Sequence, residues 1–206
     1  MQNSLRHLPV LIVDCQTTGA SPARGCLLEV GWCAVTAARR TVAERDVTAR
    51  LLRLPRGNAV PGPISRLTGI TAHDLMQADE RGAVWHRLRS AAAAVDPGNA
   101  MPWAVAHVAR FEEQFLRDLH AACDPQSEFP LRFLCTHEIV RRLLPNLPRR
   151  GLRAVAGYFG FCLPELKRSA AHVAAQVAAR NSATSRAVRA RRWRRGPRPS
   201  STPSDR

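Results

Sequence analysis

The side chains best suited to catalysis or metal binding are an aspartate near the start of the chain and the polar segment that follows it. Asp14 comes directly after the apolar run 10–13, whose aliphatic and β-branched side chains predict a buried strand. A carboxylate at the end of such a strand loses hydration, and a cation or hydrogen-bond donors must offset the free-energy cost. Rigid strands often hold metal ligands. The segment 16–19 can equally be an ordinary turn, because Thr and Gly are common turn residues. These residues alone leave a metal site and a simple turn as equal alternatives.

Charge and cysteine content narrow the class of protein. The 206 residues carry 31 Lys and Arg against 16 Asp and Glu, a formal net charge of +15. Such a charge favours polyanionic partners, nucleic acid first, because a strongly basic surface attracts phosphate. The six cysteines lack CxxC spacing and several lie in apolar runs, which predicts buried thiols. Neither a signal-peptide pattern nor an apolar run of about eighteen residues is present, so we expect a cytoplasmic protein without a membrane partner.

The hydrophobic pattern predicts strands first and then strands that alternate with helices. Strands are expected over residues 10–13, 26–35, 41–54, 103–107 and 133–136, with a hairpin link over 36–40. Helices are expected from Ile64 to a stop at Gly69, then over residues 72–77 with a Thr71 cap, and over 83–94, 109–119, 137–144, 151–159 and 164–179. This order predicts an α/β fold in which helices flank a mixed sheet.

The composition divides the chain into a domain, residues 1–180, and a tail, residues 181–206. The tail holds eight Arg against one Asp and almost no aliphatic residues, so we expect it to be disordered. It can grip phosphates and stack Trp193 on a base, or be a solvated extension without a specific role. Because the change at Asn181 is abrupt, a damaged reading frame is a further explanation of the tail.

Four segments resemble, in order, motifs of the DnaQ-like (DEDDh) 3′-to-5′ exonucleases, the family of the polymerase III proofreading subunit and RNase T. Residues 14–19 resemble D-x-E-T-T-G, and residues 26–31 resemble the strand I-I-E-I-G. Residues 68–71 are similar to h-G-I-T, and residues 105–116 to V-A-H-N-A-x-F-D-x-x-F-L. The resemblance covers residues 8–179, and the combined order and spacing is more specific than any single motif. It implies an RNase H-like α/β fold.

The resemblance also implies a reaction, a cofactor and partners. The family hydrolyses phosphodiester bonds at 3′ ends of DNA or RNA, and a DNA polymerase subunit is a possible partner. Four carboxylates hold two divalent cations about 3.5–4 Å apart, Mg²⁺ or Mn²⁺ for such oxygen ligands, and a histidine accepts a proton from water. Asp14 and Glu112 match carboxylate positions as metal ligands, and Gln16 stands at another as a neutral ligand. The residues matched to substrate binding are Thr17, Thr18, Gly19 and His107.

The last family motif, H-x-A-x-x-D-A, matches this chain in two registers. The preferred register makes His172 the catalytic base and leaves Val177 at the aspartate position. The other puts Lys167 at the histidine and His172 at the aspartate. Neither supplies a carboxylate, although Glu29 and Glu113 are possible substitutes. Only two of the four carboxylates of the family site remain, so the repulsion between two divalent cations would be poorly compensated.

Two functions follow from this charge deficit. The first is a 3′-to-5′ exonuclease with one or two ions and weakened activity, because lost ligands reduce transition-state stabilisation. The alternative is a catalytically inactive relative that binds nucleic acid through its basic surface and tail.

Overall fold

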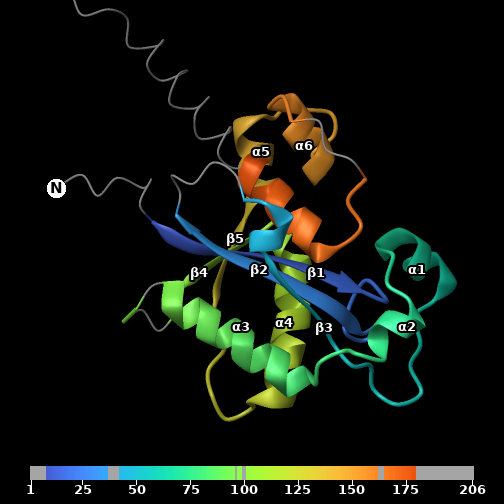
Figure 1. The fold of residues 1–206 in the computed structure, drawn as a ribbon. Coiled ribbons are helices and arrows are strands. Elements are labelled where there is room, and N and C mark those ends of the chain that lie inside the picture. Colours follow the sequence, from blue (N-terminus) through green and yellow to red (C-terminus); the bar gives the residue numbers. More distant parts are fainter. Residues whose placement is uncertain (1–7, 37–41, 96, 99–100, 162–164, 180–206) are drawn as a thin grey trace, which may run out of the picture.

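A five-stranded mixed sheet forms the centre of the molecule, with strand order β3-β2-β1-β4-β5 (Figure 1). The computed structural model describes residues 8–36, 42–95, 97–98, 101–161 and 165–179. The strands are β1 (Pro9–Thr17), β2 (Leu27–Thr36), β3 (Thr48–Leu51), β4 (Trp103–Ala106) and β5 (Arg132–Cys135). β2 pairs antiparallel with β1 and β3, whereas β4 pairs parallel with β1 and β5. The predicted mixed sheet is therefore confirmed.

Helices cover both faces of this sheet. The elements are a 3-10 helix η2 (Glu44–Asp46), α1 (Gly62–Thr68), α2 (Ala72–Leu75), α3 (Arg81–Val95), α4 (Ala109–Cys123), α5 (Thr136–Leu143), α6 (Leu152–Tyr158) and an unlabelled helix over residues 169–179. In Figure 1, α3 and α4 lie on one side of the sheet, and helix 169–179 lies on the other. None of the helices in the described ranges is long and apolar enough to cross a membrane.

The alternation of side chains along β1 determines which layer each residue faces. Leu11 and Val13 belong to the larger core cluster, which also contains buried residues of α3 and α4. Val10 and Ile12 belong to a second cluster with Val173 of helix 169–179. Because successive strand residues point to opposite faces, the carboxylate of residue 14 points toward helix 169–179.

β1 extends further than the sequence pattern predicts. We expected the strand to end at Asp14, but it continues to Thr17, with a register irregularity between Gln16 and Thr17. The reason is its antiparallel ladder with β2, where Asp14 lies opposite Gly31 and Gln16 opposite Glu29. Both polar side chains are consequently held on a rigid strand rather than on a turn.

Other elements agree with the prediction except in length. Gly69, in the left-handed region at φ 70°, ends α1, and Thr71 begins α2 with a reciprocal capping box to Asp74. The third strand is short because a 3-10 helix of charged residues, η2, precedes it. The last helix begins at Ser169, not at residue 164. Of the predicted hairpin link over residues 36–40, residue 36 ends β2 and residues 37–40 lie outside the described residues, as does the tail 181–206.

Candidate site around Asp14

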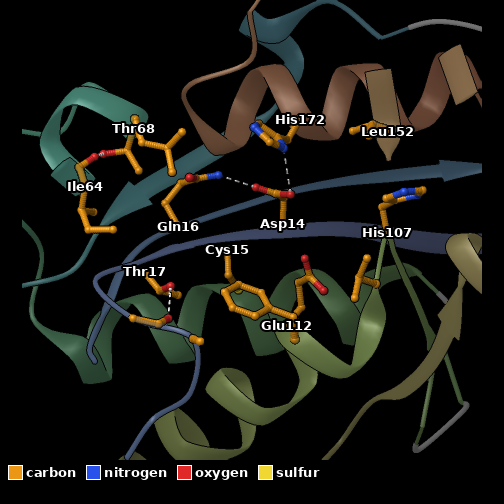
Figure 2. Close-up of a pocket in the computed structure, with 15 residues that line it drawn as sticks. Asp14, Cys15, Gln16, Thr17, Ile64, Thr68, His107, Glu112, Leu152 and His172 are labelled. Atoms are coloured by element: carbon orange, nitrogen blue, oxygen red, sulfur yellow. Dashed lines mark hydrogen bonds and ion pairs between the residues drawn. The ribbon is translucent and has the colours of Figure 1, made fainter. Parts of the chain in front are cut away.

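A pocket of about 550 Å³ lies above the end of β1 and collects most of the residues singled out in the sequence. Asp14, Gln16, Glu112, His107 and His172 contribute its polar lining (Figure 2). The side chains that make its apolar wall are Ile64, Leu67, Phe111 and Leu152. Thr17 and Gly19 also line the pocket, whereas Thr18 does not. Segments far apart in the sequence therefore meet at one cavity with a polar floor and an apolar wall.

Both carboxylate oxygens of Asp14 already have partners within the protein. The Nε2 of Gln16 donates a hydrogen bond to Oδ2 at 2.8 Å, and Nδ1 of His172 lies 3.4 Å from Oδ1 (Figure 2). Asp14 is only 5% exposed, and burial raises its pKa despite these two partners. Its hydration is thus replaced by protein groups.

The imidazole of His172 has partners on both nitrogens. Besides the contact of Nδ1 with Asp14, Nε2 lies 3.3 Å from the carbonyl oxygen of Leu166. Burial disfavours the charged ring, but the hydrogen bond and the negative charge of Asp14 outweigh it and raise the pKa of His172. Asp14 and His172 are therefore each other's polar partners in the pocket.

Glu112 faces the same pocket from the first turn of α4. It is 4% exposed, and its Oε2 has no hydrogen-bond partner among the described residues. Burial and then the charge of Asp14 raise the pKa of Glu112 to about 9. At neutral pH this carboxyl is protonated, so it adds no negative charge to the pocket.

The positions of Val177 and His172 separate the two registers of the last motif. Val177 is fully buried in the second core cluster with Val10 and Ile12, and it does not line the pocket. His172 lines the pocket and contacts Asp14. Residues five apart on a helix point in directions about 140° apart, so both cannot face the pocket. Of the two registers, only the one that assigns His172 to the aspartate position of the motif places that position next to Asp14.

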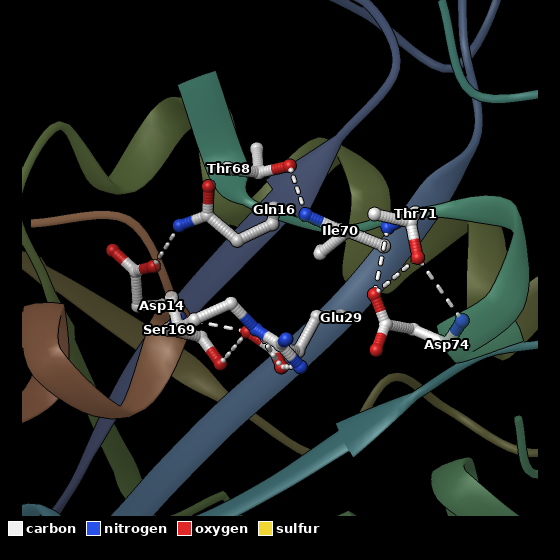
Figure 3. A network of polar contacts seen from close by, with 9 residues as sticks. Asp14, Gln16, Glu29, Thr68, Ile70, Thr71, Asp74 and Ser169 are labelled. Atoms are coloured by element: carbon white, nitrogen blue, oxygen red, sulfur yellow. Dashed lines mark hydrogen bonds and ion pairs between the residues drawn. The ribbon is translucent and has the colours of Figure 1, made fainter. Parts of the chain in front are cut away.

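Neither possible substitute supplies the lost carboxylate. Glu29 is 1% exposed and its carboxylate is used elsewhere (Figure 3). It accepts hydrogen bonds from Nε of Arg168 at 2.9 Å and from the backbone N and Oγ of Ser169 at 2.8 and 2.7 Å. Glu113 pairs with Arg117 at 2.8 Å on the surface of α4. No local sequence pattern indicates the contacts of Glu29 with Arg168 and Ser169, because they span 139 and 140 residues.

His107 and the predicted turn residues have structural roles. His107 places Nδ1 3.0 Å from Oγ1 of Thr136 and Nε2 2.8 Å from the carbonyl oxygen of Arg150, and burial lowers its pKa. The Thr17 hydroxyl donates to the carbonyl oxygen of Gly19 at 2.7 Å, and Thr18 Oγ1 accepts from the Cys26 amide at 2.7 Å. The three polar side chains therefore stabilise the pocket wall and the turn.

These groups do not fit a pair of divalent cations. The described part of the chain contains no group of three or more His, Cys, Asp or Glu side chains that could hold a metal ion. Asp14 is already paired with His172, Gln16 carries no charge and Glu112 is protonated at neutral pH. A cation would have to displace His172 from Asp14 and a proton from Glu112, and the gain must exceed both costs.

Comparisons with known proteins identify the fold. No protein-family model matches the sequence, and no curated protein matches it either. A zinc-bound complex of E. coli exonuclease I with single-stranded DNA aligns at TM-score 0.72 and 16% identity, covering 91% of this chain and 42% of that chain. Exonuclease X in complex with 5′ overhanging duplex DNA aligns at TM-score 0.63 and 17% identity, covering 87% of this chain and 93% of that chain.

A product-bound exonuclease I aligns at TM-score 0.68 and 16% identity, covering 91% of this chain and 46% of that chain. The protein therefore spans less than half the length of the exonuclease I chains that it matches. These likenesses confirm the predicted RNase H-like exonuclease fold.

Proposed function

We propose that this chain is a DnaQ-like superfamily member that binds single-stranded 3′ ends of nucleic acid in the pocket over Asp14 and lacks two-metal hydrolysis. The observation that carries the proposal is the occupation of both Asp14 oxygens by Gln16 and His172. The fold, the motif order and the net charge of +15 support the nucleic-acid partner. The polymerase subunit implied by the resemblance stays a prediction.

The lining of the pocket provides the means of binding. Its apolar wall, with the ring of Phe111, can pack against a terminal base, since base stacking tolerates any sequence. Protonated Glu112 can donate its O–H to a phosphate or ribose oxygen, which an ionised carboxylate would repel. Where the implied cation would contact Asp14, the imidazole of His172 takes its place as the polar partner.

Competition binding tests the preference for 3′ ends. The chain first binds a fluorescein-labelled dT12 strand in EDTA. Two unlabelled competitor strands are then compared, one with its 5′ end in a hairpin and a free 3′ end, and one with its 3′ end in a hairpin and a free 5′ end. The proposal predicts that the strand with a free 3′ end displaces the probe at much lower concentration. Equal displacement by both strands would contradict it, because the chain would then bind along the backbone without recognising an end.

A second function is favoured by a different observation. The Oε2 of buried Glu112 has no hydrogen-bond partner among the described residues, and the charge of Asp14 contributes to raising the pKa of Glu112 to about 9, so a free oxygen ligand lies near Asp14. Asp14 and Glu112 would hold a single ion, with the amide oxygen of Gln16 as a neutral ligand. A bound ion would supply Lewis-acid stabilisation and an acidified water, the basis of weak exonuclease activity.

Thermal unfolding separates the two functions. Single-ion binding predicts that Mn²⁺ raises the Tm of the wild-type chain and not that of Glu112→Gln. The first proposal predicts no shift in either protein at millimolar Mn²⁺.

A further inference from the structure

We infer that three arginines on separate segments, Arg66, Arg110 and Arg153, form a rim that binds the phosphates of a single-stranded nucleic acid at the mouth of the pocket. The inference rests on the proposed function, because it names the side chains that hold the strand outside the pocket. Each arginine is a sequence neighbour of lining residues. Arg66 lies between the lining residues of α1, Arg110 lies between the lining residues Val108 and Phe111 at the start of α4, and Arg153 follows the lining residue of α6.

The three rim side chains are available to a ligand. All three are exposed, and none of them forms an ion pair with a described residue. Several arginines elsewhere in the described part of the chain have acidic partners. Those paired with Asp or Glu include Arg53, Arg81, Arg87, Arg89, Arg117 and Arg141. Phosphate binding at the rim would therefore not have to break an internal salt bridge.

The charge around the rim is one-sided. Residues 62–71 and 103–111 contain no Asp or Glu, and neither does the stretch 139–164, in which Arg153 is one of five arginines. The segments that surround the mouth are thus positive.

A single strand is the ligand that fits these features together. Guanidinium groups bind phosphate oxygens in a bidentate manner, and three of them on different segments can engage different phosphates of one strand. The apolar wall between them accepts a base, which acidic peptides lack. Nonspecific single-strand sites combine such a charged track with stacking surfaces.

Salt-dependent binding tests the rim. Anisotropy of fluorescein-labelled dT12 is measured from 50 to 200 mM NaCl with the full chain, with Arg66→Gln/Arg110→Gln/Arg153→Gln, and with Arg45→Gln/Arg56→Gln/Arg132→Gln. The second triple variant is a matched control, because it removes the same charge from exposed arginines on segments that contribute nothing to the pocket. Each phosphate contact on a single strand contributes about 0.7 to the slope of log K against log salt.

The rim variant should lose about 2 units of slope and at least tenfold in affinity at 50 mM NaCl, whereas the control keeps nearly the wild-type slope. A triple Arg→Lys rim variant should retain most of the slope, because the charges remain. Equal losses in the rim and control variants would overturn the rim while leaving the proposed function intact. Failure of the wild-type chain to bind dT12 would overturn both.

Discussion

At the scale of single residues, the site is defined by how its charges cancel. Asp14 pairs with His172 and accepts a hydrogen bond from Gln16, and burial holds Glu112 in its protonated form. Each of these interactions removes negative charge from a position where the related motifs carry carboxylates. The chemistry of the pocket therefore changes through the neighbours of Asp14, while the aspartate itself is kept.

The raised pKa of Glu112 predicts a pH-dependent stability. The folded pKa of about 9 exceeds the ordinary value of 4.5, so the contribution is fully present below pH 4.5 and is lost as pH rises through 9. Between these values, this group lowers the free energy of unfolding by up to about 1.4 kcal/mol per pH unit. Urea unfolding of Glu112→Gln in EDTA should show higher stability than wild type at pH 8.5 and equal stability at pH 4. Parallel pH profiles for the two proteins would contradict the assignment.

Restoring carboxylates should restore metal binding. The double variant Gln16→Glu/His172→Asp places four acidic side chains at the pocket, since residues 14 and 112 are already there. Like-charge repulsion should lower its Tm in EDTA, and Mn²⁺ at 100 times its Kd should stabilise it by about 2.7 kcal/mol. Differential scanning fluorimetry measures both effects, with Val177→Asp as the comparison. If Val177→Asp gains Mn²⁺ binding and the double variant does not, the register inferred from the His172 contact is wrong.

At the scale of elements, the position of helix 169–179 depends on Glu29 of β2. The carboxylate accepts hydrogen bonds from the first helical residue, Ser169 (Figure 3), and from the guanidinium of Arg168. These bonds bring His172, one turn later, to Asp14 (Figure 2). A side chain at Gly31 would interfere, because a Cβ there would lie 2.7 Å from Oγ of Ser169. The sheet and the helix therefore approach closely at this contact.

Glu29→Gln should loosen this contact. Loss of the charge-assisted bonds is expected to cost about 2–3 kcal/mol of unfolding free energy, moderated because Arg168 is partly exposed. Glu113→Gln breaks an exposed pair on α4 and should cost under about 1 kcal/mol. Urea denaturation of both variants measures the difference. Equal, small losses would show that Glu29 does not hold the helix.

At the scale of the whole molecule, the fold was predictable because its signals are local. Alternating strands, the Gly69 stop and the Thr71 cap each act within a few residues, and the motif order predicted the RNase H-like fold that the solved structures confirm at 15–17% identity. The site was predictable only as a set of residues. The Asp14–His172 contact and the Glu29 network join residues about 140 or more positions apart, so only the packed chain reveals them.

The central claim is that the pocket binds a 3′ end without metal-dependent hydrolysis. Fluorescein-labelled dT12 is incubated with the full chain and with Asp14→Ala in EDTA, Mg²⁺ or Mn²⁺, and strand length and anisotropy are followed together. The account predicts the same affinity in EDTA and in either cation, with no shortening of the strand beyond that seen with Asp14→Ala. Cation-dependent shortening from the 3′ end that Asp14→Ala abolishes would contradict it.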